Sequence, residues 1–576
     1  MRAVVRFAIF LFSVAILAGV PVIAQQPTVG LLHNSDEAWV GYTLFSPQGE
    51  MTTYLINNGG LLINSWATTV PPGLMGYLRD NGNLVRAGRL SGTGGAGLVE
   101  EYDWDGNLIW SFEYTSGGNV SHHDIEPLPN GNVLMIAYET KTQTEAIQAG
   151  RNPSTIPGEL WPDHIIEVEP VPPTGGNIVW EWHVWDHLIQ DYDASKDNYG
   201  VVADHPELVD INYTGGTTPA NWTHFNGVSY NADLDQIIVS SRTLSEVWIL
   251  DHSTTTAEAA GHTGGNSGVG GDILYRWGNP QTYGRGTETD RTLFSQHDAT
   301  WIPEGLPGAG NVLVFNNGKG RPTPEYSSVD EFVPPVDENG HYTLEDGEAF
   351  EPGAAVWSYS SSPSEFYAIQ FSGAQRLENG TTLICDGPKG RMIEVQTDGS
   401  VVWEYRNPVG SGGGVAQGEA PPATNVFKVR RYSPDFPGFV GRDLTPGDPI
   451  ETFTAAQPVP QGSVVASRVS DTAIDVSWDE TTCMAWGYDL IYGDLVDVPS
   501  FALLGAECGI GTSGSFNWTN VPAGSLYFLI VGRESSGIYE SGWGVDSAGN
   551  PRLPHRAADL CGSTIKATAT VCPSLP

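Results

Sequence analysis

Short apolar runs bounded by turn residues recur along the first three quarters of the chain, and few long stripes of helical period interrupt them. In one recurrent form, a turn leads into two or three apolar residues and then a tryptophan, as in residues 106–110 and 399–403. Such runs predict β-strands. The tryptophans of six runs are Trp66, Trp110, Trp180, Trp277, Trp357 and Trp403. We expect them in outer strands, with each indole packed between neighbouring sheets.

A second pattern places Asn-Gly between two apolar runs, for example in residues 128–134 and 377–384. Both residues of this pair tolerate positive φ, so the pattern predicts tight hairpins. The shortest spacings between tryptophan runs match a four-stranded blade, and the longer ones leave room for inserted loops. Six such units predict an all-β fold with a six-bladed β-propeller over residues 25–440, closed by a last strand at residues 425–430.

The end of the chain has a different pattern. Residues 441–462 are rich in Pro and Gly and are interpreted as a linker. Residues 463–576 contain short alternating runs and predict a small fibronectin-type-like β-sandwich, an accessory or attachment module. Four of the five cysteines lie there, so two disulfides are expected, with three pairings open; these are Cys483, Cys508, Cys561 and Cys572. Cys385 is expected to be a buried free thiol.

The first residues and the overall charge bear on location and partners. Two arginines, an apolar run and Val22-Ile-Ala24 predict a secretory signal peptide at residues 1–24, and hence a secreted, periplasmic or extracellular protein. A retained anchor is the alternative, although the apolar run is short for one. The net charge of −40 excludes nucleic acid and anionic membranes as partners, because both require a basic face. An anionic substrate therefore requires a locally basic pocket.

Three histidines share one position ahead of predicted inner strands, namely His123, His224 and His297. The repeat would turn all three toward the axis of the ring. Clustered histidines suit either a metal site or nucleophilic and acid–base chemistry on an anionic group held by arginine. The second is favoured, with no metal and no cofactor, because no His-x-x-x-His or similar local pair occurs in this register.

Several other motifs are interpreted as structural. His183, His187 and His252 fall in or near outer strands and insertions. The acidic stretch 191–197 lacks the glycine and the closing glutamate of an EF-hand calcium loop. The glycine-rich stretch 261–272 lacks the lysine and the following helix of a phosphate loop, so we expect a flexible surface loop there.

A set of ordered motifs resembles those of the bacterial arylsulfotransferase (aryl-sulfate sulfotransferase) family: His122-His-Asp124, Trp222-Thr-His-Phe-Asn226, Gln296-His-Asp298, Phe315-Asn-Asn-Gly318 and Ser372-Gly-Ala-Gln-Arg-Leu377. The resemblance runs through most of residues 40–440. It implies a six-bladed propeller that transfers a sulfuryl group from an aryl sulfate to a phenolic acceptor through a sulfohistidine, without a nucleotide donor. On these motifs the catalytic candidates are His224, His297 and Arg321, and the substrate-binding candidates are His123, Asp124, Asn226, Asp298 and Asn317.

One departure from the family pattern concerns the nucleophile. The resemblance implies a nucleophilic histidine within residues 361–377, but this stretch contains none; Tyr367, Gln370, Ser372 and Gln375 occupy it. Either His224, His297 or His123 takes over the attack, or this branch binds without that chemistry. The alternative function is therefore a non-catalytic secreted propeller, a binding or surface-structural protein, with the C-terminal segment as a candidate for cell-surface attachment.

Overall fold

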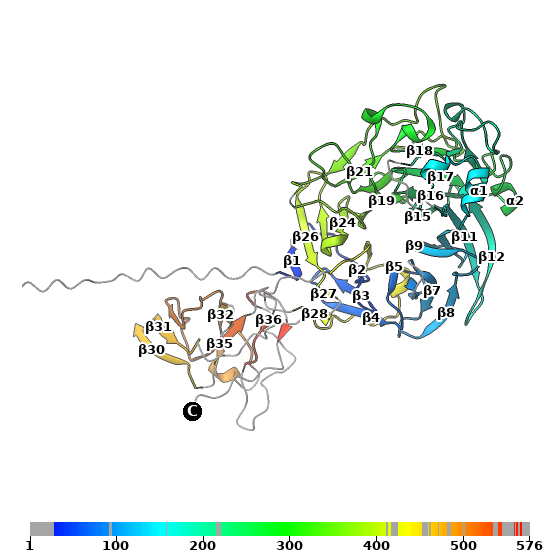
Figure 1. The fold of residues 1–576 in the computed structure, drawn as a ribbon. Coiled ribbons are helices and arrows are strands. Elements are labelled where there is room, and N and C mark those ends of the chain that lie inside the picture. The colour runs from blue at the N-terminus through cyan, green and yellow to red at the C-terminus, as the bar shows by residue number, and fades with distance from the viewer. Residues whose placement is uncertain are drawn as a thin grey trace, which may run out of the picture. The chain divides into compact units, whose positions relative to one another are not determined.

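The structure is a computed structural model that describes most of the chain up to residue 451 and parts of the C-terminal segment (Figure 1). The described residues are 28–90, 95–156, 158–214, 220–363, 365–410, 413–415, 424–451, 459, 462–470, 472–480, 485, 487–498, 501–533, 539–543, 558, 560–562 and 565–566. The predicted signal peptide lies outside them. The chain divides into two compact units, Thr28–Thr454 and the segments Met1–Pro27 with Ala455–Pro576. In the described part, no helix is long and apolar enough to cross a membrane.

The larger unit is nearly all β. Among its described residues, six antiparallel sheets of four or five strands follow one another around a ring in Figure 1. They are β29-β2-β3-β4, β5-β6-β7-β8, β12-β11-β10-β9, β15-β16-β17-β18, β19-β20-β21-β22 and β1-β26-β25-β24-β23.

The strands of the first three sheets are β2 (Tyr42–Phe45), β3 (Thr52–Asn57), β4 (Leu62–Ala67), β29 (Arg430–Tyr432), β5 (Pro72–Leu78), β6 (Leu84–Arg89), β7 (Gly97–Tyr102), β8 (Leu108–Glu113), β9 (Val120–Pro127), β10 (Val133–Tyr138), β11 (Asp163–Pro170) and β12 (Gly176–His183). Those of the other three are β15 (Phe225–Asn231), β16 (Gln236–Ser241), β17 (Glu246–Asp251), β18 (Tyr275–Trp277), β19 (His297–Trp301), β20 (Val312–Asn316), β21 (Ser328–Phe332), β22 (Trp357–Tyr359), β23 (Gly373–Arg376), β24 (Thr382–Asp386), β25 (Arg391–Val395), β26 (Val401–Arg406) and β1 (Gly30–Asn34).

The connections between sheets carry short elements. They are α1 (Gln143–Gln148), α2 (Thr256–Ala259), β13 (Leu188–Ile189), β14 (Val209–Asp210), β27 (Val409–Gly410), β28 (Gly413–Gly414) and the 3-10 turns η1 (Pro153–Thr155), η2 (Val184–Asp186), η3 (Val202–Asp204), η4 (Pro280–Tyr283), η5 (Glu288–Asp290), η6 (Gly387–Lys389) and η7 (Pro437–Phe439). Capping boxes begin both α-helices, because Thr142 and Thr255 each accept a backbone N–H from a glutamate that bonds back.

Two pairings between distant parts of the sequence close the ring. β1 pairs with β26, and β29 pairs with β2 in the register Tyr42↔Tyr432. The closing strand therefore begins at Arg430, where the sequence pattern had placed its end. Phe427 and Lys428 lie outside this ladder. The ring of Phe427 contacts that of His297, and Lys428 pairs with Asp124 and Asp298. Closure of this kind leaves few exposed sheet edges.

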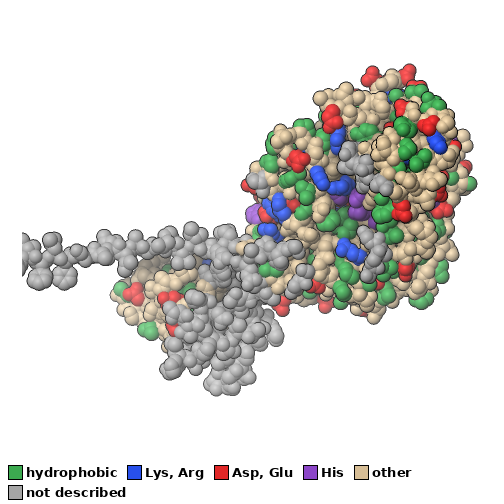
Figure 2. All heavy atoms as spheres, in the orientation of Figure 1, with side chains coloured by type: hydrophobic (Ala, Val, Ile, Leu, Met, Phe, Trp, Pro, Cys, Tyr) green, Lys and Arg blue, Asp and Glu red, His purple; other side chains and the backbone are tan. Residues whose placement is uncertain are grey.

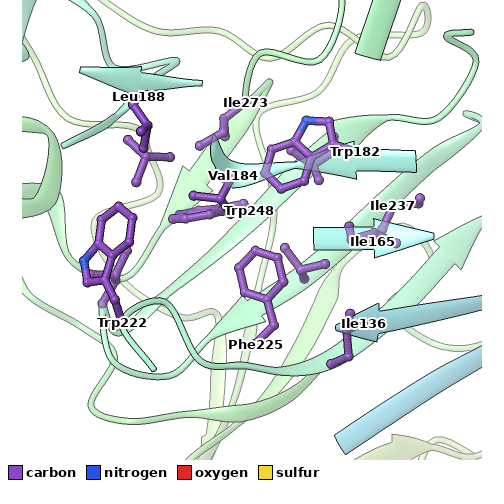
Figure 3. Packing of buried hydrophobic residues seen from close by; sticks show 14 of the residues in the cluster. Ile136, Ile165, Trp182, Val184, Leu188, Trp222, Phe225, Ile237, Trp248 and Ile273 are labelled. Carbon is purple, nitrogen blue, oxygen red and sulfur yellow. The ribbon is translucent and has the colours of Figure 1, made fainter. Parts of the chain in front are cut away.

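The tryptophans occupy the outer strands as expected, in β4, β8, β12, β18, β22 and β26. Five of the six are buried; Trp357 remains partly exposed because it lies on the short strand β22. Figure 3 shows how neighbouring sheets share a core. Trp182 from β12, Phe225 from β15 and Trp248 from β17 pack in one cluster, with Trp222 and Ile273 from the connections. Burying such side chains contributes about 1.5–3 kcal/mol each.

The inner strands carry a repeated irregularity. Register shifts interrupt the pairing of β5, β9, β15 and β19 with their neighbours. Backbone φ is positive at His123, His224 and Asp298, within or beside three of these shifts. Non-glycine residues rarely adopt this conformation, and it re-aims the side chain relative to a regular strand. The side chains of His123, His224 and Asp298 therefore point in directions that a regular strand would not give them.

The described residues of the smaller unit form two sheets. One is β30 (Val465–Ser470), β31 (Ala473–Ser477) and β34 (Ser515–Trp518); the other is β33 (Gly505–Glu507), β32 (Gly487–Asp494), β35 (Leu526–Arg533), β36 (Tyr539–Glu540) and β37 (Ile565–Lys566), with η8 (Leu495–Asp497) between strands. One apolar cluster draws on both sheets through Val476, Tyr488 and Trp518. Cys508 and Cys561 form a disulfide, whereas Cys483 and Cys572 lie outside the described residues. In the larger unit, Cys385 is a buried free thiol, as predicted.

Candidate active site

The three predicted histidines lie together at the centre of the larger unit. The rings of His123 and His224 meet edge to face with centroids 4.8 Å apart. The rings of His123 and His297 each lie 6.1 Å from the ring of Phe427. Figure 2 shows histidine and basic side chains gathered in a hollow on the viewed face. Three separate inner strands thus bring imidazoles to one place, as the repeated register predicted.

The tautomer of His297 is fixed by Asn317. The amide nitrogen of Asn317 donates to the carbonyls of Ala368 (2.7 Å) and Phe371 (3.0 Å), so its Oδ1 is an acceptor. Nδ1 of His297 lies 2.7 Å from that oxygen and must donate to it. The proton of a neutral His297 is therefore on Nδ1, and Nε2 carries a lone pair. This is the arrangement that an activated nucleophile requires.

His123 stands at the end of a hydrogen-bonded chain that begins at Asp163. Nε2 of His122 lies 2.7 Å from the carboxylate of Asp163 and donates to it. Nδ1 of His122 is then an acceptor for Nδ1 of His123, 2.8 Å away. Asp163 also accepts hydrogen bonds from the Thr223 hydroxyl and from the backbone N–H of Phe225, so its position is fixed. The chain leaves Nε2 of His123 as the unprotonated ring nitrogen.

The environment keeps all three imidazoles neutral. Removal from water lowers the pKa of His297 to about 3, and the positive charge of Arg242 acts in the same direction. Burial likewise lowers the pKa of His224, followed by the charge of Arg242. For His123, burial is followed by the effects of the neighbouring histidines and then by Arg242. Neutral imidazoles beside one arginine form a site with nitrogen lone pairs and a positive charge.

Arg242 was not predicted from the sequence. Its backbone N–H donates to the carbonyl of His224 (3.1 Å), at the end of the β15–β16 hairpin. Within the described residues, its guanidinium makes no hydrogen bond and no ion pair. The hairpin pairs Phe225 with Ser241, so the same register places Arg242 opposite His224. This register could have been used to predict Arg242 from the sequence.

Arg321, the predicted arginine, has other partners. Its guanidinium lies 4.0 Å from the ring centroid of Tyr326 and 5.5 Å from that of Phe294, and it donates to the hydroxyl of Ser328 (3.1 Å). Among the described residues, it contacts none of the three histidines. The structure therefore brings the histidines to Arg242 and does not bring Arg321 into contact with them.

Asp124 and Asp298 meet in a buried ion cluster. Nζ of Lys428 lies 2.6 Å from Asp124 and 2.7 Å from Asp298. Arg430 donates to both carboxylate oxygens of Asp298, and the hydroxyl of Tyr77 donates to Asp124. Burial alone would raise the pKa of Asp298, but the charges of Arg430 and Lys428 outweigh it and lower that pKa strongly. Each aspartate is thus paired with a basic side chain within the protein.

Both aspartates also bind backbone. Asp124 accepts from the N–H of Val228 and Asp298 from that of Ala374, so each ties its strand to the next inner strand. Asn226 does the same by donating to the carbonyl of Gln296 (2.8 Å). These three predicted substrate-binding residues hold the strands that carry the histidines.

A pocket of about 600 Å³ opens at the opposite ends of the same inner strands. Its lining includes Glu126, Thr300, Gln375 and Arg430 and none of the three histidines. Burial and the charge of Asp124 raise the pKa of Glu126 to about 8. We place the candidate chemistry at His123, His224 and His297 because their rings converge there, whereas none of them lines this pocket.

A comparison with known families places the chain in one of them. Residues 79–408 match the arylsulfotransferase (ASST) family. The chain belongs to this family. A relative, the arylsulfate sulfotransferase AssT of Lelliottia amnigena, is 26% identical over 315 residues, which cover 48% of this chain and 49% of that protein. The match thus spans about half the length of this curated arylsulfotransferase.

Solved structures are more distant from this arylsulfotransferase family member. A protein of unknown function from Bacteroides caccae has a TM-score of 0.37 at 13% identity and covers 68% of this chain and 98% of its own. AztD from Citrobacter koseri has a TM-score of 0.31 at 8% identity, with coverages of 69% and 99%.

Phe371 lies in the stretch 361–377, where the resemblance implies a further histidine. Phe371 and Ser372 precede β23 and both have positive φ, as His123 and His224 do at the corresponding strands. The ring of Phe371 packs on Phe427 at 5.8 Å. Phe427 also contacts the rings of His123 and His297, so the apolar ring of Phe371 packs beside the site in this arylsulfotransferase family member.

Proposed function

We propose that this protein transfers a sulfuryl group from an aryl sulfate to a phenolic acceptor, with the reaction at His123, His224, His297 and Arg242. The observation that carries the proposal is the arrangement of His297, with Nδ1 committed to Asn317 and a neutral imidazole beside an arginine without an ion-pair partner among the described residues. Family membership supports the reaction class.

His297 is the nucleophile in this proposal. Its Nε2 lone pair attacks sulfur, a nitrogen–sulfur bond forms, and the sulfur–oxygen bond to the aryl group breaks with its electrons on the leaving phenolate. Arg242 stabilises the charge on the sulfuryl oxygens, with the forked geometry that suits oxyanions. The intermediate is a sulfohistidine, and Nδ1 keeps its hydrogen bond to Asn317 throughout.

His123 is the acid and base. The negative charge of a bound sulfate favours protonation of its Nε2, and the positive charge is shared through His122 with Asp163. His123 gives this proton to the leaving phenolate. In the second step it takes the proton of the acceptor phenol, whose oxygen attacks sulfur and releases Nε2 of His297. One proton is thus delivered and recovered per cycle.

His224 orients the substrate against His123 in this scheme, and Asp124, Asp298 and Asn226 are positioning residues. They fix the bulged strands on which the imidazoles sit, so their effect on the reaction is indirect. The position of Arg321 beside aromatic rings suits the rim of the site, where it would bind the aryl part or the sulfate on entry.

The wider assignment rests on the same reasoning. Six four- or five-stranded sheets with two closing pairings support a six-bladed propeller over residues 25–440. The two packed sheets of the smaller unit support a β-sandwich over 463–576, joined by a linker at 441–462. The disulfide supports an oxidising compartment and hence secretion through the segment 1–24.

The direct test is transfer from a chromogenic aryl sulfate to phenol by the purified protein. We expect release of the chromophore that depends on phenol, and a sulfuryl adduct on the protein when phenol is omitted. His205→Ala, in an exposed pair with Glu207, is the control and should behave as wild type. A wild-type protein that releases no chromophore with any phenol tested would favour the non-catalytic binding function.

The roles of the two arginines can be separated. Arg242→Gln should lower kcat by about 10²–10³-fold because it removes the charge from the sulfuryl oxygens. Arg242→Lys should recover part of this loss, since it restores a charge without the fork. Arg321→Gln should act mainly on KM. Steady-state kinetics on wild type and the three variants distinguish these roles. A larger loss of kcat for Arg321→Gln than for Arg242→Gln would assign the stabilisation of the sulfuryl oxygens to Arg321.

A further inference from the structure

A second group of ligand-type side chains lies in two connections of the larger unit. His187 follows η2 in the connection from β12 to β15, whereas His262 and Asp272 lie in the connection from β17 to β18. Nδ1 of His187 lies 3.0 Å and Nδ1 of His262 2.7 Å from Oδ1 of Asp272. All three atoms lie within 4.8 Å of one another. The two connections therefore meet at a point lined by two imidazoles and a carboxylate.

The hydrogen bonds of His187 decide what this point can hold. Its Nε2 lies 2.8 Å from the carbonyl oxygen of Ala259 and must donate to it. In a neutral imidazole Nδ1 is then a lone pair, and it faces a carboxylate oxygen that is also an acceptor. Two acceptors 3.0 Å apart require a cation or a shared proton between them. The side chain of His187 is fully buried.

The contacts around His187 are of the kind that commonly orient a histidine metal ligand. A histidine ligand commonly donates its second ring N–H to a carbonyl, which fixes the ring. The indole of Trp182 stacks on His187 at 5.4 Å and donates to the carbonyl of Gly271 (2.6 Å). Gly271 leaves no room for a Cβ because Ala259 lies against it. Figure 3 shows Trp182 within the core cluster that supports this connection.

The glycine-rich stretch is built around the same point. Backbone hydrogen bonds join Gly270 to Gly264 and Gly271 to Gly261 (3.0 Å each), so the connection folds back on itself between His262 and Asp272. His262 is 59% exposed and approaches from the solvent side. The stretch therefore presents one solvent-facing ligand opposite two buried ones.

We propose that Nδ1 of His187, Nδ1 of His262 and Oδ1 of Asp272 bind one divalent transition-metal ion of the zinc class. Imidazole nitrogen with one carboxylate suits Zn²⁺, whereas Mg²⁺ and Ca²⁺ prefer oxygen alone. Bonds of about 2.0–2.2 Å to these atoms would place the oxygen of Asp272 slightly farther from the two nitrogens than its present 3.0 and 2.7 Å. The exposed side leaves a fourth position for water. The ion ties the two connections together and acts independently of the sulfuryl-transfer site.

The competing explanation is a metal-free ion pair in which His187 or His262 is protonated and Asp272 is its partner. Metal binding separates the two. The purified full-length protein, without a histidine tag, would be treated with EDTA, dialysed and titrated with Zn²⁺ by calorimetry, and with Co²⁺ by visible absorption. We expect one ion per chain and the intense cobalt bands of a four-coordinate site.

Variants make the test specific. His262→Ala changes an exposed side chain, and Asp272→Asn keeps the shape of its residue; both should weaken Zn²⁺ binding by at least about 100-fold. His205→Ala should bind Zn²⁺ as wild type does. Zn²⁺ should also raise the melting temperature of wild type but not of His262→Ala. No bound Zn²⁺ in wild type, or equal binding by wild type and His262→Ala, would overturn the proposal in favour of the ion pair.

Discussion

Replacing His297 by alanine should lower kcat/KM for sulfuryl transfer on the order of 10⁴-fold, the loss expected when a nucleophile held in its reactive tautomer is removed. The fold should survive because the ring is one of several packed on Phe427. Trapping the sulfuryl adduct with aryl sulfate alone distinguishes roles: His297→Ala should form none, whereas His123→Ala and His224→Ala should still form it slowly. An adduct on His297→Ala that is absent from His224→Ala would move the nucleophile to His224.

The pH dependence gives a second readout for His297. Because its pKa in the folded protein is about 3, Nε2 stays unprotonated, and the acid limb of kcat/KM should come from other groups. The unfolded pKa is about 6.5, so the unfolded chain binds more protons between these values. Stability therefore rises with pH from about 3 to about 6.5, and His297→Asn should flatten that rise. An unchanged slope in thermal unfolding would contradict a neutral, buried His297.

Replacing Lys428 by methionine should cost about 3–5 kcal/mol in the free energy of unfolding. The lysine is buried between Asp124 and Asp298, and its removal leaves two buried carboxylates with Arg430 as the remaining basic partner described for them. The change should appear as a lower midpoint in urea, followed by tryptophan fluorescence of the larger unit.

A matched surface pair provides the control for Lys428. Arg391 binds Glu404 at 2.7 Å, and both side chains are about one fifth exposed. Arg391→Met should cost less than about 1 kcal/mol, because solvent screens such a pair. Equal losses for the two variants would show that the central ion cluster adds no more stability than a surface pair. Lys428→Met should also lower kcat, since the cluster fixes the strands that carry the histidines.

The strands were predictable because their signals are local. The tryptophan runs and Asn-Gly turns specify outer strands and hairpins within a few residues, and Trp66, Trp110 and Trp403 lie where the pattern put them. The closing strand was predicted at residues 425–430 but lies at Arg430–Tyr432. Its position depends on a partner strand nearly the whole length of the larger unit away in sequence, as in the pair Tyr42↔Tyr432. The bulges could not be predicted from the sequence for the same reason, because a register shift is defined only relative to the neighbouring strand.

The sequence by itself determined that His123, His224 and His297 share one register, because a repeated unit turns equivalent positions toward the same place. Only the tertiary structure decided their environment. It brought Arg242 beside them, packed Phe371 on Phe427, and paired Lys428 with Asp124 and Asp298. The physical reason is that burial, tautomer and charge pairing depend on contacts between distant strands, whereas the strand pattern depends on neighbours along the chain.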